Sequence, residues 1–133
     1  MTREILVVDD DREDVEFLEQ AFAEIKDVRS ISIKSFSNYF DVIKHLKTSG
    51  DTPSLIITDY NMPNITGFNL ATYFKRNESF SSIPVVVLSG TIDETEKLRL
   101  LHAGVLKIYS KPQEIEGYIE IAKELVEIVH PYA

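Results

Sequence analysis

The apolar positions of this chain alternate between two spacings, and they do so five times. Short, nearly continuous apolar runs are typical of strands buried on both faces, and they fall at 5–8, 55–58 and 83–88. Ile31 and Ile33, with Phe36 following, predict a second strand, and the short segment 106–109 predicts a fifth. After each run, apolar residues recur at steps of three or four, which is the spacing of one helix face. These striped segments lie at 15–25, 39–46, 70–74, 98–101 and 115–129. The pattern predicts five strand–helix repeats.

Five such repeats imply a parallel sheet, because each return to the same edge needs a crossover connection. These crossovers are right-handed and place helices on both faces of the sheet. No linker or repeated sequence divides the 133 residues, and this length suits one domain. We therefore expect a single α/β domain over residues 1–133, with a doubly wound, five-stranded parallel sheet of the (βα)₅ type.

Breaks in the apolar pattern indicate where the elements end. The segment 50–53 contains Gly and Pro and separates the second helix from the third strand. The segment 61–67 is expected to be a loop that leads into the third helix. Gly104 is expected just beyond the fourth helix, where a left-handed glycine is common. Pro131 is expected to end the last helix.

The composition excludes several classes of function. The chain has 14 Lys and Arg against 22 Asp and Glu, a net charge of −8, which argues against direct binding to nucleic acid or to an anionic membrane surface. The chain lacks cysteine, which excludes disulfides and Cys-ligated metal sites. Its apolar runs are too short to cross a bilayer, and its first residues show no signal-peptide pattern. We expect a soluble, cytoplasmic protein.

Residues that can carry chemistry follow four of the five expected strands. Asp9 and Asp10 follow the first strand and Asp59 follows the third. Ser89 follows the fourth strand, and Lys111 follows the fifth. The carboxyl ends of parallel strands open on one edge of the sheet, where ligands bind in folds of this kind. These residues, which are distant in sequence, are therefore expected to meet.

Three carboxylates at one edge would be costly without a counter-charge. Two like charges about 4 Å apart repel by about 4 kcal/mol at an effective dielectric near 20, and a whole domain is stable by only about 5–15 kcal/mol. Either some of these groups hold a proton or a cation neutralises them. A site with few protein ligands, oxygen donors and room for phosphate favours Mg²⁺. Lys111 can supply a positive charge when the cation is absent.

Each of these residues, taken alone, has an ordinary structural explanation. Asp11 is expected to be a helix-capping or first-turn acid, and Ser89 or Lys111 alone would suit a turn or the surface. Their joint placement at strand ends is what favours a site. His45, His102 and His130 lie away from that edge and are given no catalytic role. The other aromatic side chains are expected to serve in packing.

In four segments the sequence closely resembles the receiver domain of two-component response regulators. The segments are Leu6–Asp11, Asp59–Pro63 with the later Gly67, Leu88–Gly90 and Lys111–Pro112. They match the family's signature positions in order and spacing, over essentially the whole chain. The resemblance implies a flavodoxin-like strand order of 2-1-3-4-5. Because the chain ends after its fifth helix, it also resembles a stand-alone receiver similar to the chemotaxis regulator, without an output domain.

The resemblance also implies roles for the residues at the edge. Asp59 matches the acid that accepts a phosphoryl group from a phosphohistidine of a sensor histidine kinase or histidine phosphotransfer protein. Asp9 and Asp10 match the acids that hold Mg²⁺, with Asp59 and the backbone carbonyl of Asn61 as further ligands. Such a domain is a signalling switch for a downstream protein target rather than an enzyme, although it assists its own phosphorylation and dephosphorylation. A monomer or weak dimer is expected.

The hydroxyl and the amine of the family's site also have counterparts. Ser89 matches the Ser or Thr that bonds a phosphoryl oxygen, and Lys111 matches the lysine that pairs with another. Together with a carboxylate nucleophile and Mg²⁺, they supply the positioning and the positive charge that phosphoryl transfer needs. Family receivers usually have a cis peptide before the following proline, so a cis bond is expected at Lys111–Pro112.

Two positions depart from the family pattern. The switch position three residues before the lysine is usually Tyr or Phe but here is Ile108. Tyr109 is one residue later, so its ring should point to the opposite face of the strand. In the family the Ser or Thr hydroxyl is usually coupled to the aromatic ring at the switch position. With Ile108 at that position, this coupling is not expected in its common form. Ile65, where methionine is common, is a milder change.

Three other classes of protein share features with a phosphorylated receiver. A pseudo-receiver that binds partners without phosphorylation usually lacks an acid, the hydroxyl or the lysine, and this chain has them all. A haloacid dehalogenase-like phosphatase also uses a strand-end Asp, but the run 9–13 ends in Glu13 and the chain is short for that fold. A flavin carrier of this topology needs a hydroxyl-rich phosphate loop, where three aspartates would repel phosphate. We keep the pseudo-receiver as the alternative.

Overall fold

The structure is a computed structural model that describes residues 3–25, 31–62 and 65–129. The main strands are β1 (Arg3–Val8), β2 (Ile31–Phe36), β3 (Leu55–Asp59), β6 (Val85–Ser89) and β7 (Lys107–Ser110). The helices are α1 (Arg12–Ala23), α2 (Tyr39–Ser49), α3 (Gly67–Arg76), α4 (Glu94–His102) and α5 (Ile115–Val129). Two short strands, β4 (Asn61–Met62) and β5 (Ile65–Thr66), lie between β3 and α3.

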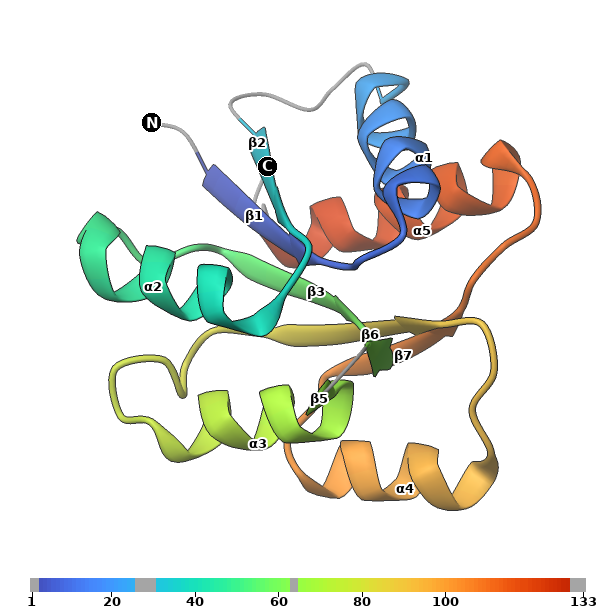
Figure 1. Cartoon of the computed structure of the whole chain (residues 1–133). Coiled ribbons are helices and arrows are strands. Elements are labelled where there is room, and N and C mark those ends of the chain that lie inside the picture. The colour runs from blue at the N-terminus through green and yellow to red at the C-terminus, as the bar shows by residue number, and fades with distance from the viewer. Residues whose placement is uncertain (1–2, 26–30, 63–64, 130–133) are drawn as a thin grey trace.

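The five main strands form one parallel sheet in the order β2-β1-β3-β6-β7. Numbered by repeat, this is the order 2-1-3-4-5 that the family resemblance implied, so the expected fold class is confirmed. Helices α1 and α5 cover one face, and α2, α3 and α4 cover the other (Figure 1). Every strand in the sheet ends toward the same edge, and Asp9, Asp10, Asp59 and Lys111 all lie at or just beyond these strand ends.

The central strands are buried on both sides, which explains their continuous apolar runs. Alternate residues point to opposite faces of a strand, so Ile5 and Val7 pack in the layer of α1 and α5, and Leu6 and Val8 pack in the layer of α2, α3 and α4. The edge strand β2 is only half-buried, and its residues alternate between exposed and partly buried. The result is one sheet with an apolar core on each face.

The start of α1 and the end of α4 lie at the residues that the sequence indicates. Asp11 is the N-cap of α1, and its carboxylate accepts a hydrogen bond from Glu13 N at 3.0 Å, which confirms the expected capping role. Gly104 follows the end of α4 with φ +104°, a left-handed conformation that favours glycine. The expected end of the last helix at Pro131 lies outside the described residues.

The structure corrects two local expectations. The segment 61–67 is not a plain loop, because β4 and β5 pair antiparallel within it and α3 begins at Gly67. The Lys111–Pro112 peptide is trans, since the described residues contain no cis peptide bond. Trans is the lower-energy form even before proline, and Lys111 reaches the acids from it, as described below. Among the described helices, none is long and apolar enough to span a membrane.

Candidate phosphorylation site

Three carboxylates gather where β1 and β3 end. Asp9, Asp10 and Asp59 each offer a carboxylate oxygen, and these oxygens all lie within 4.8 Å of one another. Asp9 and Asp59 are only 5% and 7% exposed, whereas Asp10 faces solvent. The parallel pairing of β1 with β3 produces this cluster, because it places the residues after Val8 beside the end of β3. The structure therefore brings these three predicted acids together.

Lys111 neutralises part of this charge. Its Nζ lies 3.2 Å from Asp9 Oδ2 and 3.3 Å from Asp59 Oδ1. The lysine is held at the rim because its backbone N–H donates to the Ser89 carbonyl at 2.8 Å, extending the pairing of β7 with β6 by one residue. The expectation that Lys111 supplies a positive charge to the acids is met by this geometry.

Burial and the lysine act in opposite directions on the acids. Burial raises the pKa of Asp9 to about 6, although the Asp11 N–H and the Lys111 ammonium both lower it. Burial also raises the pKa of Asp59, opposed first by Lys111 and then by backbone hydrogen bonds from Tyr60 and Asn61. Carboxylates with raised pKa values at one edge are typical of functional sites.

A fourth acid, Asp14, was not among the expected site residues. Its Oδ2 lies 2.6 Å from Lys111 Nζ, the shortest of the three ion pairs of that lysine. Its Oδ1 accepts a hydrogen bond from the Tyr118 hydroxyl at 3.2 Å. Burial lowers the pKa of Lys111, but the hydrogen bond to Asp14 and the charges of Asp9 and Asp59 together raise it above its ordinary value.

Tyr118 anchors this arrangement from α5. Its side chain is 1% exposed, and its ring stacks on Phe17 of α1 with centroids 5.1 Å apart. The expectation of a packing role for this aromatic residue is therefore right but incomplete, because the hydroxyl also holds Asp14. The only sequence signal for a role of Asp14 is its position directly before Val15, the first buried residue of α1.

Ser89 lies at the same edge but is not bonded to the acids. It is fully buried at the end of β6, one residue beyond the Leu88 that pairs with Asp59. Its hydroxyl donates to the Thr91 carbonyl at 3.0 Å. Asn61, the other expected participant, is exposed in β4, two residues after Asp59.

The departures from the family pattern have the expected geometry. Ile108 packs in the layer of α3 and α4, and Tyr109 packs on the opposite layer with α5, where its hydroxyl lies 3.3 Å from Glu124 Oε1. Of the histidines, His45 pairs with Glu4 at 3.1 Å near the start of β1, and His102 is exposed on α4. His130 lies outside the described residues.

The donor set suits a small divalent cation. Three carboxylate oxygens within 4.8 Å of one another need only a modest contraction to coordinate one ion, since Mg²⁺–oxygen distances are about 2.0–2.1 Å. A partly exposed site also leaves room for water, which Mg²⁺ keeps in most protein sites. The residues present therefore fit the cation that the resemblance implies.

The sheet order and the acid–lysine cluster together define a receiver domain. Residues 5–123 match the family described as the response regulator receiver domain, and the chain belongs to this family. Among solved structures, it resembles the phosphorylated cyanobacterial phytochrome response regulator RcpA (TM-score 0.87, 22% identity, 100% of this chain and 97% of that one). It also resembles the chemotaxis response regulator CheY4 of Vibrio cholerae (TM-score 0.75, 17% identity, 94% of this chain and 99% of that one). At these identities the likeness concerns the fold.

Curated relatives match over parts of longer proteins. The hybrid signal transduction histidine kinase D of Dictyostelium discoideum is 33% identical over 60% of this chain and 5% of its own length. The sensor histidine kinase CheAY of Helicobacter pylori is 19% identical over 93% of this chain and 15% of its own. The two-component response regulator ARR5 of Arabidopsis thaliana is 28% identical over 84% of this chain and 64% of its own length. The chain thus spans less than two thirds of the length of these relatives.

Proposed function

We propose that Asp59 accepts a phosphoryl group from the phosphohistidine of a sensor histidine kinase or histidine phosphotransfer protein, and that the resulting acyl phosphate changes a surface read by a downstream protein. The observation that carries the proposal is the position of Lys111, whose ammonium lies within 3.3 Å of both Asp9 and Asp59. A carboxylate nucleophile beside a fixed positive charge is what an incoming phosphoryl group requires.

The reaction is an in-line displacement at phosphorus. A carboxylate oxygen of Asp59 forms the new O–P bond while the P–N bond to the donor histidine breaks, and the imidazole leaves with that electron pair. Lys111 is already beside the nucleophile, so its ammonium meets an oxygen of the transferred group. The Ser89 hydroxyl exchanges its bond to the Thr91 carbonyl for a second phosphoryl oxygen.

Asp9, Asp10, Asp59 and the backbone carbonyl of Asn61 would hold Mg²⁺ at this edge, which supplies further positive charge to the phosphoryl oxygens when bound. The similarly folded response regulator Rcp1 has been solved in a Mn²⁺-bound form (TM-score 0.82, 18% identity, 94% of this chain and 92% of that one). That structure supports a divalent cation in this fold.

The partners and the setting follow from the same chemistry. Two of the curated relatives are themselves histidine kinases, which supports a histidine kinase as the phosphoryl donor. We further propose that residues 1–133 work as one cytoplasmic domain, as a monomer or weak dimer. In this proposal the domain is a signalling module rather than an enzyme, and it assists its own phosphorylation and dephosphorylation.

The test is the intact mass of the protein after incubation with acetyl phosphate, with and without Mg²⁺. We expect wild type to gain one phosphate in a Mg²⁺-dependent reaction, and Asp59→Asn to gain none because the nucleophile is lost. Asp51→Asn is the matched control, since Asp51 is an exposed acid before β3. If wild type gains no phosphate, the chain is a pseudo-receiver; if Asp59→Asn gains as much as wild type, Asp59 is not the acceptor.

A further inference from the structure

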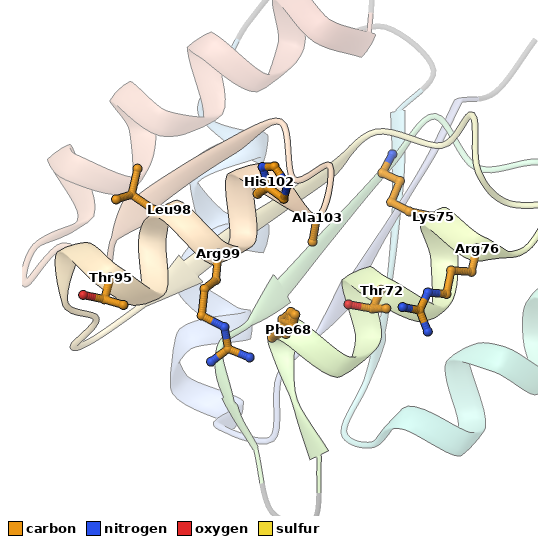
Figure 2. Close-up of a pocket in the computed structure, with 9 residues that line it drawn as sticks. All are labelled: Phe68, Thr72, Lys75, Arg76, Thr95, Leu98, Arg99, His102 and Ala103. Carbon is orange, nitrogen blue, oxygen red and sulfur yellow. The ribbon is translucent and has the colours of Figure 1, made fainter.

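A groove runs between α3 and α4, and its lining includes none of the acids or the lysine of the proposed phosphorylation site. It encloses about 750 Å³ and is lined by nine residues that include Phe68 and Thr72 on α3 and Leu98, Arg99 and His102 on α4 (Figure 2). Leu98 is 66% exposed. We call this feature the α3–α4 groove, and it plays no part in the phosphorylation described above.

The charge of the α3–α4 groove is opposite to that of the chain. Its lining includes Lys75, Arg76, Arg99 and His102 but no acid, although the chain carries a net charge of −8. Within the ranges that the structure describes, neither Arg76 nor Arg99 forms an ion pair with a carboxylate. Two exposed guanidinium groups are therefore left for an anionic ligand.

The three Lys and Arg residues of the lining are not equivalent. The Lys75 ammonium donates to the carbonyls of Ser81 and Ile83, at 3.3 and 3.0 Å, and points away from the arginines (Figure 2). Arg99 lies over the ring of Phe68, 4.3 Å from its centroid, which orients its guanidinium toward α3. The available positive charge is thus that of Arg76 and Arg99, on opposite helices.

The ligand-accessible surface continues across α3. A second hollow of about 510 Å³ shares Phe68, Thr72 and Arg76 with the α3–α4 groove and extends to Asn77, again without an acidic residue. These three residues are spaced four apart and so form one stripe along the helix. The Thr72 hydroxyl in this stripe is buried without a hydrogen-bond partner in the described part of the chain. A stripe with a hollow on each side suits a ligand that follows the helix axis.

We propose that the α3–α4 groove binds a short amphipathic segment of a partner protein, whose apolar side chains enter between Phe68 and Leu98 and whose Asp or Glu side chains pair with Arg76 and Arg99. Helix-in-groove recognition combines an apolar floor with charged rims in this way, and complementary charge supplies the specificity. A nucleic acid or membrane is disfavoured by the negative charge of the rest of the chain. The proposal does not depend on phosphorylation of Asp59.

The experiment selects peptides from a displayed random 12-residue library on the untreated wild-type protein. We expect the enriched sequences to combine Leu, Ile or Phe with Asp and Glu, and to lose at least tenfold in affinity for Arg76→Gln/Arg99→Gln. The matched control is Lys44→Gln/Lys123→Gln, which removes the same charge from exposed residues of α2 and α5. Amide NMR spectra of both variants verify that the fold is kept.

Three outcomes would overturn the proposal. The first is no enrichment, or enriched peptides without acidic residues. The second is binding that both double variants weaken equally, which would indicate only long-range attraction. The third is self-association of wild type in sedimentation that Arg76→Gln/Arg99→Gln abolishes, because the groove would then be an interface between copies of this chain.

Discussion

At the scale of single residues, the ammonium of Lys111 is shared among three carboxylates of different function. Asp9 and Asp59 are the proposed cation and phosphoryl ligands, while Asp14 holds the lysine from α1 at 2.6 Å. Because Asp14 is itself bonded to the buried Tyr118, it is the fixed end of this arrangement. We infer that Asp14 positions Lys111 and keeps it from pairing solely with the acids that would bind Mg²⁺.

Asp14→Asn should therefore weaken Mg²⁺ binding. The substitution removes one nearby negative charge and leaves Lys111 to compete with the cation for Asp9 and Asp59, so both effects act in the same direction. We expect the dissociation constant for Mg²⁺ to rise about three- to tenfold, which corresponds to roughly 1 kcal/mol. Calorimetric titration of the unphosphorylated protein with MgCl₂ measures it.

Glu13→Gln is the control for that titration, because Glu13 is the neighbouring exposed acid in the first turn of the same helix. It changes the charge equally but touches neither Lys111 nor Tyr118. An unchanged affinity in Asp14→Asn, or equal losses in the two variants, would contradict a positioning role for Asp14.

The sequence could predict the strand-end residues but not Asp14. Asp9, Asp10, Asp59 and Lys111 follow apolar runs, and the geometry of a parallel sheet delivers such positions to one edge. The place of Asp14 depends instead on the rotation of α1 against α5, which sets which side of the buried stripe faces the lysine. That rotation is fixed by packing between helices far apart in the chain, and no local pattern encodes it.

At the scale of elements, α5 approaches the loop that carries Lys111 through a single glycine. A Cβ built on Gly117 would lie 2.5 Å from Cβ and 3.0 Å from Cγ of Pro112. Both atoms belong to a rigid ring next to Lys111, so the loop itself would have to move. The glycine thus sets how closely the helix and the proposed site can pack.

Gly117→Ala should destabilise the protein, even though alanine favours a helix by about 1 kcal/mol over glycine. The steric conflict with Pro112 should outweigh that gain, since overpacking costs typically about 1–3 kcal/mol. We expect a net loss of roughly 1 kcal/mol in the free energy of unfolding, measured by urea denaturation. Gly90→Ala is the control, because a Cβ there meets nothing within 4 Å, and it should change stability by less than about 0.5 kcal/mol. A stabilised Gly117→Ala protein would show that the proline moves freely.

Element types were more predictable than element details. All five strand–helix repeats follow from apolar periodicity, whereas the hairpin of β4 and β5 has two-residue strands, which are too short to show any period. The apolar segment predicted over 115–129 is α5, and its buried residues are Tyr118, Ile121, Ala122, Leu125 and Val129. The helix is apolar over a wide arc, so the sequence leaves open which line of residues faces the sheet.

At the scale of the whole molecule, the cation-free acids should make global stability depend on pH. The pKa of Asp9 is raised by burial from 3.8 to about 6, and that of Asp59 is raised as well. At a pH between 3.8 and about 6, the Asp9 carboxyl holds a proton in the folded protein and has released it in the unfolded chain. The stabilising contribution is therefore complete below pH 3.8 and is lost as the pH rises through about 6.

In EDTA, the protein should thus be more stable at pH 5 than at pH 7. We expect a difference of roughly 0.5–1 kcal/mol from Asp9, after allowance for partial screening by solvent. Asp9→Asn should reduce the difference. Saturating Mg²⁺ should reduce or reverse it, because the cation stabilises the ionised form. Urea-unfolding midpoints at both pH values measure this, and a pH dependence identical in wild type and Asp9→Asn would contradict the assignment.

The neighbours of Asp59 connect it to both sides of the sheet. On one side, Lys111 leads through Asp14 to Tyr118 of α5. On the other, Tyr60 is buried in the layer of α3 and α4, where burial, and then a hydrogen bond to Glu96 of α4, raises its pKa to about 12. Two proteins bound on opposite faces of the sheet would then each influence the carboxylate of Asp59. Thermodynamic linkage is reciprocal, so two such proteins would alter each other's affinity without ever touching.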